Sequence, residues 1–196
     1  MPNRLSLVAI GAATVVALAA GTRPSLADTS STLVVRVRDE AHLPDRTVQD
    51  ALMIAGGVYR RAGIAVQWLP AAAGGSPDPT LTIVIAPRAA NAEFRIGEGS
   101  MGVAHSLDGM RGTVAYVLVD RVRAFSERGH IDAWIVLGCA IAHELGHLLL
   151  PVNAHAPEGI MRAQWDPKLI SRAGGFLSFA PDQGRLLRLR VASREP

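Results

Sequence analysis

The feature that most restricts the fold of this chain is an apolar segment from Asp132 to Leu150 that carries one compact polar motif. Drawn with the period of a helix, the segment is apolar nearly all round, which predicts a helix buried on every side. Within it, residues 143–147 read His-Glu-Leu-Gly-His, and buried histidine and glutamate side chains are costly without partners. The fold must therefore enclose this helix and also supply a partner for three polar side chains.

The spacing of the polar motif is that of a metal site. On a helix, His143 and His147 lie one turn apart on the same face, so both imidazoles can reach one ion. Glu144 is rotated by about 100° around the axis, which places it beside the ion without making it a ligand. Zinc suits such a nitrogen pair. Chance would produce this pattern only about 0.007 times in a chain of this composition, so we expect zinc rather than two core histidines bonded to backbone.

A catalytic zinc ion takes three protein ligands and keeps one open position. Pro151 ends the apolar helix, and His155 follows eight residues after His147, where a turn can bring it back over the helix end. Glu158 and Asp166 are the alternatives for the third ligand, because carboxylates also bind zinc. His155 is favoured over them because three neutral imidazoles keep the site cationic, which promotes a hydroxide-like water.

Hydrophobic periodicity predicts a single α+β domain around this helix. The expected strands are 32–38, 64–68, 81–86, 102–107 and 114–119, and the expected helices are about 45–62, 132–150 and 182–191. Residues 28–150 would form an N-terminal part that includes the motif helix. Residues 151–196 would form a smaller, loop-rich C-terminal part that ends in the last helix.

The first 27 residues have the design of an export signal. Arg4 supplies a positive start, Leu5–Ala20 is a charge-free stretch of 16 residues, and small residues before Asp28 permit cleavage. The stretch is shorter than the roughly 20 residues that a membrane-spanning helix needs. We therefore expect a secreted or periplasmic mature protein, residues 28–196, with no stable membrane insertion.

The sequence pI of about 9.7 suggests a nucleic-acid partner, but the charge distribution argues against one. Removal of the leader deletes Arg4 and Arg23 and no acidic residue, so 18 basic residues face 17 acidic ones, without a basic run. Cys139 is the only cysteine, so an exported chain has no internal disulfide and depends on its core. We interpret Cys139 itself as a small core residue.

Residues 143–162 resemble the metzincin group of zinc metalloproteases. His-Glu-Leu-Gly-His is followed by His155 and then by Gly159-Ile160-Met161, and in metzincins a tight turn places a methionine beneath the zinc ligands. The usual spacing, HExxHxxGxxH, would require glycine at 150 and histidine at 153. This chain has Leu150 and Asn153 there, so a wider turn is expected.

The resemblance implies a zincin-like fold, with a mixed twisted sheet of about five strands and an active-site helix. It implies one catalytic zinc ion bound by His143, His147 and His155. Glu144 would be the general base, and Met161 would be the turn methionine.

These observations favour an exported zinc endopeptidase whose peptide or protein substrate pairs with the 102–107 edge strand. Two alternatives remain open. The first is a zincin-like binding module with a structural or vestigial metal, for which Cys139 or Glu158 would have to supply a fourth ligand. The second is a zinc hydrolase that acts on non-peptide substrates.

Overall fold

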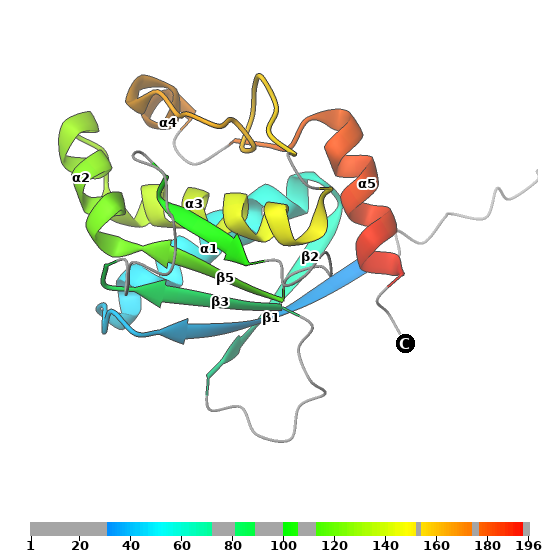
Figure 1. The fold of residues 1–196 in the computed structure, drawn as a ribbon, viewed down its shortest axis with the longest axis horizontal. Coiled ribbons are helices and arrows are strands. Elements are labelled where there is room, and N and C mark those ends of the chain that lie inside the picture. The colour runs from blue at the N-terminus through cyan, green and yellow to red at the C-terminus, as the bar shows by residue number, and fades with distance from the viewer. Residues whose placement is uncertain are drawn as a thin grey trace, which may run out of the picture.

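The computed structural model describes residues 31–71, 81–88, 100–105, 113–151, 154–173 and 177–193. Its strands are β1 (Ser31–Asp39), β2 (Ile64–Pro70), β3 (Leu81–Ala86), β4 (Gly102–His105) and β5 (Val114–Leu118). They form one sheet in the order β2-β1-β3-β5-β4, in which β4 runs antiparallel and the other neighbours are parallel (Figure 1). The α+β class and the mixed five-stranded sheet that we expected are thus confirmed.

The described chain has five helices, two more than the sequence predicted. They are α1 (Asp45–Arg61), α2 (Val119–Gly129), α3 (Ala133–Leu149), α4 (Pro167–Ala173) and α5 (Pro181–Ala192). The predicted strand 114–119 ends one residue early, because Val119 already begins α2. The predicted edge strand 102–107 is seen as β4, while its last two positions fall among residues that the structure does not describe.

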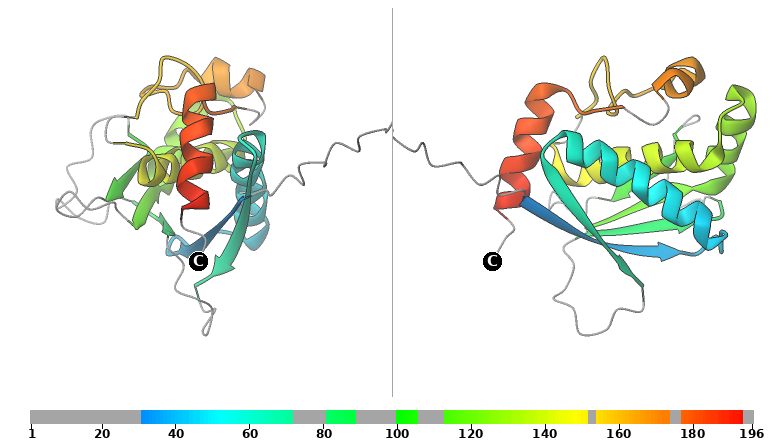
Figure 2. Two further views of the ribbon diagram at one scale, coloured as in Figure 1. Left: turned by 90° about the vertical axis from the view of Figure 1, so that its right-hand side faces the viewer. Right: turned by 180° about the vertical axis from the view of Figure 1, so that it is seen from behind.

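Helices α1 and α3 cross the same face of the sheet (Figures 1 and 2). Strand β1 turns alternate side chains toward them, so Leu33, Val35 and Val37 are buried in the core. The two helices touch closely at Gly138, where a Cβ atom would lie 2.7 Å from the Cβ of Ile54. A larger residue at 138 would force the helices apart.

The motif helix α3 is buried as the sequence predicted. The sheet lies beneath it, α1 packs along its side, and the segment that follows it folds back over it (Figure 2). Its last residue is Leu149, and Leu150 is extended (φ −88°, ψ 165°), which is the conformation favoured before a proline. Pro151 therefore turns the chain away, so that the following segment can return toward the motif.

No described helix has the length and apolar character that a membrane crossing requires. The predicted export signal, residues 1–27, lies outside the described part of the chain.

Candidate metal centre

The structure brings His143, His147 and His155 together where the segment after α3 folds back over that helix. One nitrogen atom from each ring can be chosen so that all three lie within 4.8 Å of one another. The Nε2 atoms of His143 and His147 are 3.0 Å apart, and the centroid of the His155 ring is 4.8 Å from that of His147. Two nitrogens bound to one tetrahedral zinc ion lie about 3.3 Å apart. The pair on the helix therefore already has nearly the separation that a shared ion needs.

The orientation of the His143 ring is set by a backbone carbonyl. Its Nδ1 lies 2.8 Å from the carbonyl oxygen of Ile160, which can only accept, so Nδ1 carries the proton and donates it. The Nε2 atom is then left with a free lone pair that points toward the other two rings. The indole nitrogen of Trp165 donates to the same carbonyl at 3.2 Å, and its ring meets the His143 ring edge to face at 5.4 Å.

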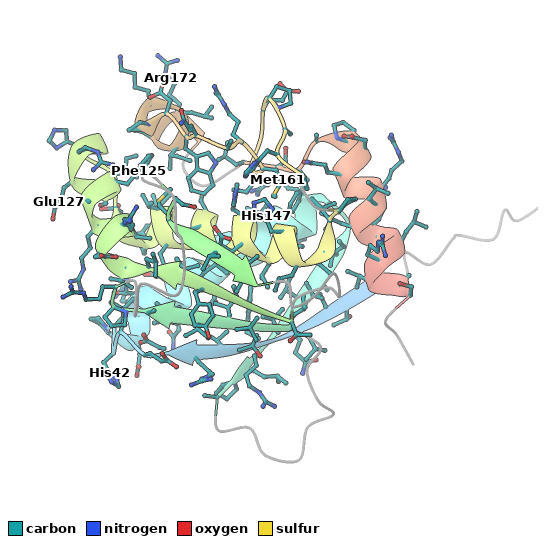
Figure 3. The ribbon with its side chains drawn as sticks, viewed as in Figure 1. His42, Phe125, Glu127, His147, Met161 and Arg172 are labelled. Carbon is teal, nitrogen blue, oxygen red and sulfur yellow. The ribbon has the colours of Figure 1, made fainter. Side chains whose placement is uncertain are left out.

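Met161 lies close to His147, in the segment that folds back over α3 (Figure 3). It is fully buried, and its sulfur contacts α3 at Gly146, where a Cβ atom would lie only 2.6 Å from it. The glycine inside the His-Glu-Leu-Gly-His motif therefore has a packing role, because any side chain there would push Met161 away from the helix. The structure thus places Met161 against the motif helix.

The turn that carries Met161 is closed by backbone bonds. Gly159 adopts φ +77°, and a Cβ atom there would meet the carbonyl oxygen of Ser178. The Ile160 nitrogen donates to that same oxygen at 2.9 Å, and the Ala156 nitrogen donates to the carbonyl of Met161 at 2.9 Å. Glycine is needed at 159 both for its conformation and for the close approach.

Glu144 points from α3 to the edge strand of the sheet. Its side chain is 5% exposed, and it fills the space above Gly102 on β4, where a Cβ atom would lie 2.6 Å from the Cγ atom of Glu144. Among the described residues, no ion pair or hydrogen bond to this carboxylate is found. The carboxylate thus lies against β4, in an apolar setting.

Burial sets the protonation of both helix histidines. It lowers the pKa of His143 to about 4, with a smaller lowering from His155 and an opposing effect from the bond to Ile160. Burial also lowers the pKa of His147 to about 3, assisted by the two other histidines. Both rings are therefore neutral at pH 7, and a neutral imidazole is the form that binds metal.

The carboxyl of Glu144 shows the opposite effect. Burial raises its pKa to about 8, because no charged group among the described residues compensates for its lost hydration. A divalent cation held by the three histidines would provide that compensating charge. The donor set, the directed lone pair and the uncompensated carboxylate all fit a bound metal ion.

The alternative ligands that the sequence offered are not part of the cluster. Glu158 and Asp166 are exposed and are absent from the one group of metal-binding side chains found in the described residues. Cys139 is buried and burial raises the pKa of its thiol to about 12, which matches the core role expected for it. Within the described chain, the cluster therefore has three protein ligands and no fourth.

Three contributors to the site were not predicted: the Ile160 carbonyl, Trp165 and Gly102. A backbone carbonyl leaves no signal in a sequence, and Gly102 is separated from Glu144 by more than forty residues. Trp165 follows the motif closely in the sequence, but nothing in the sequence predicts its hydrogen bond to the Ile160 carbonyl.

Comparison with known proteins finds no family model that matches this sequence and no curated protein that matches it.

Proposed function

We propose that this chain is an exported zinc-dependent metallopeptidase of the metzincin type, with Glu144 as its general base. The observation that carries the proposal is one constellation. Three histidines converge from α3 and the segment after it, and a buried carboxylate from the same helix packs against an open sheet edge. A hydrolytic site has a use for each of these parts.

His143, His147 and His155 would hold the zinc ion, and the absence of a fourth ligand among the described side chains leaves one position for water or substrate. When bound, zinc supplies Lewis acidity, which polarises a carbonyl group and lowers the pKa of water toward neutrality. The Ile160 carbonyl keeps His143 in the tautomer that binds through Nε2.

Glu144 would perform the proton transfers. Its carboxylate takes a proton from the attacking water and then passes it to the nitrogen of the departing amine, so that the side chain ends in its starting state. Burial between α3 and β4 keeps bulk water from competing for that proton. Gly102 lets the carboxylate lie close to the strand.

The edge of the sheet favours a peptide as substrate. β4 pairs on one side with β5 and has no strand on its other side within the described chain. An extended peptide can add to such an edge through backbone hydrogen bonds, whatever its side chains are. A scissile bond held there would lie beside Glu144, because Glu144 packs on Gly102.

The contact of Met161 with the motif helix at Gly146 supports the metzincin type in particular. The third histidine comes two residues later than the usual spacing. The extended Leu150 at the end of α3 is compatible with the wider turn that this spacing requires. The zincin-like fold and the division at residue 150 belong to the same proposal.

The proposal is tested by digestion of a proteome-derived peptide library with the mature protein, residues 28–196. Wild type should cleave, a chelator should abolish cleavage, and added zinc should restore it. Glu144→Ala should retain stoichiometric zinc and lose peptide hydrolysis, whereas Glu158→Gln, an exposed carboxylate outside the cluster, should cleave normally.

Retained cleavage by Glu144→Ala would reject the mechanism. Stoichiometric zinc without cleavage by wild type would favour the binding module or a hydrolase of other substrates. Spectroscopy of the cobalt-substituted protein separates these two, because a binding module with a closed site would show four protein ligands and no bound water.

A further inference from the structure

The third histidine differs from the other two in how it is held. His143 and His147 are fixed by the helix that carries them, but His155 is exposed and lies on irregular chain. A ligand on irregular chain keeps its place only if the backbone on either side is anchored. On its C-terminal side, the Ala156 nitrogen donates to the Met161 carbonyl.

The anchor on the N-terminal side is a glutamine from a distant helix. The Nε2 atom of Gln183 donates to the carbonyl oxygen of Ala154 at 2.7 Å. Gln183 is the third residue of α5 and is 7% exposed. Its amide is therefore a polar group buried in the described part of the chain, as the carboxyl of Glu144 is. An amide that has lost its hydration needs such partners, so this contact is maintained in the folded protein.

The other end of the same amide anchors the helix. Its Oε1 atom lies 3.4 Å from the Ala180 nitrogen, the residue before α5. Gln183 thus joins the start of α5 to the residue that precedes His155. The two roles require opposite chemistry, since the loop bond needs a donor and the helix bond needs an acceptor.

We infer that Gln183 is a positioning residue for the third metal ligand. It acts through the Ala154 carbonyl on the place of His155 and touches neither metal nor substrate. The effect on metal binding rests on the proposed function, whereas the contact of Gln183 with the Ala154 carbonyl does not. Loss of the donor frees the chain before His155, so that the third imidazole no longer converges with the other two.

The double role allows a sharp variant. Gln183→Glu keeps the shape of the side chain and its acceptor toward Ala180, and a carboxylate near a helix N-terminus is favourable. It replaces the donor toward Ala154 by an oxygen that repels the carbonyl. Gln183→Leu removes both bonds without adding charge. Arg188→Ala is the matched control, because Arg188 also donates from α5 to a backbone carbonyl, that of Ala62 at 2.8 Å, away from the site.

The experiment measures two quantities on the mature protein. The first, taken in chelator, is the amide hydrogen exchange of Ala156, which should be about tenfold faster or more in both Gln183 variants and unchanged in Arg188→Ala. The second is the zinc dissociation constant by chelator competition, which should rise by about 10- to 100-fold in the Gln183 variants only. The cobalt-substituted variants should show spectra of a site with two imidazoles.

Unchanged exchange at Ala156 in both Gln183 variants would overturn the inference, whether or not the protein binds metal. Equal weakening of zinc binding by Arg188→Ala would also overturn it, because the effect would then come from loosening α5. Failure of wild type to bind zinc would overturn the proposed function, while faster exchange in the Gln183 variants alone would still establish the anchor.

Discussion

Replacement of Glu144 by glutamine should stabilise the metal-free protein while it abolishes activity. Burial raises the pKa of this carboxyl from 4.5 to about 8. Between those two pH values the folded protein keeps a proton that the unfolded chain has released. The free energy of unfolding therefore falls as the pH rises through this range. Glutamine has the same shape and no proton to lose, so the variant escapes this destabilisation.

The size of the effect follows from the two pKa values. Between pH 4.5 and pH 7, a span of 2.5 pH units, the carboxyl is ionised in the unfolded chain but protonated in the folded protein. This difference lowers the free energy of unfolding by about 3 kcal/mol. The free energy of unfolding of Glu144→Gln should therefore exceed that of metal-free wild type by about 3 kcal/mol at pH 7 and by less than about 1 kcal/mol at pH 5. Few substitutions in a core stabilise by this much, and those that do commonly remove a group retained for function.

Urea unfolding in chelator at pH 5 and pH 7 measures the difference directly, with Glu158→Gln as an exposed control that should match wild type. Saturating zinc should reduce the difference in free energy of unfolding between the variant and wild type, because the cation compensates the charge of the wild-type carboxylate. Equal stability of wild type and Glu144→Gln at pH 7 in chelator would refute the reasoning, since it would mean that the carboxylate is already compensated.

Three further predictions concern other parts of the site. Burial lowers the pKa of His143 from 6.5 to about 4, so its contribution to stability is complete above pH 6.5. About 3 kcal/mol of that contribution is lost as the pH falls toward 4. A free energy of unfolding in urea that stays constant over this pH range, for metal-free Glu144→Gln, would contradict this. Gly102→Ala should lower the free energy of unfolding by about 1–3 kcal/mol and kcat/KM by more than tenfold, because its Cβ meets Glu144 and the Tyr116 carbonyl. Gly57→Ala should do neither, because its Cβ would make only an ordinary contact, at 3.6 Å, with the Arg61 side chain. The Cys139 thiol, with its pKa raised to about 12, should react with a thiol reagent only on unfolding, and rapid labelling of the native protein would show the burial to be wrong.

The elements that could be predicted are those with a complete local signal. The apolar segment of α3 is bounded by Asp132 and Pro151, so both its type and its ends were visible. Strand β1 shows clear alternation, and β3 is a short apolar run. In each of these elements, most of the side chains that the pattern predicts to be buried are buried in the fold.

The two missed helices lack such a signal. α2 continues β5 without a turn residue between them, and its buried side chains are only Val119, Val122 and Phe125 among charged neighbours. Three apolar side chains among so many charged ones give too weak a periodicity to predict a helix. α4 has seven residues and buries only Ile170, too few for periodicity to appear.

The candidate site divides in the same way. The approach of His143 to His147 depends on one helical turn, so spacing alone predicts it. The place of His155 depends on two hydrogen bonds of its chain neighbours, from Gln183 to the Ala154 carbonyl and from the Ala156 nitrogen to the Met161 carbonyl. The spacing of the histidines in the sequence does not predict either bond. Sequence reasoning could name this ligand among alternatives but could not show what holds it.

Glycines mark the places where distant elements meet at this site. Gly102 admits the side chain of Glu144, Gly146 admits the sulfur of Met161, and Gly159 admits the carbonyl of Ser178. Each lies on a different element, and each permits an approach that any Cβ atom would prevent. A chain could therefore keep all three histidines and the glutamate and still lose the site through one added methyl group. The ligand motif alone is not a sufficient criterion for such a centre, because the absent side chains determine whether the ligands converge.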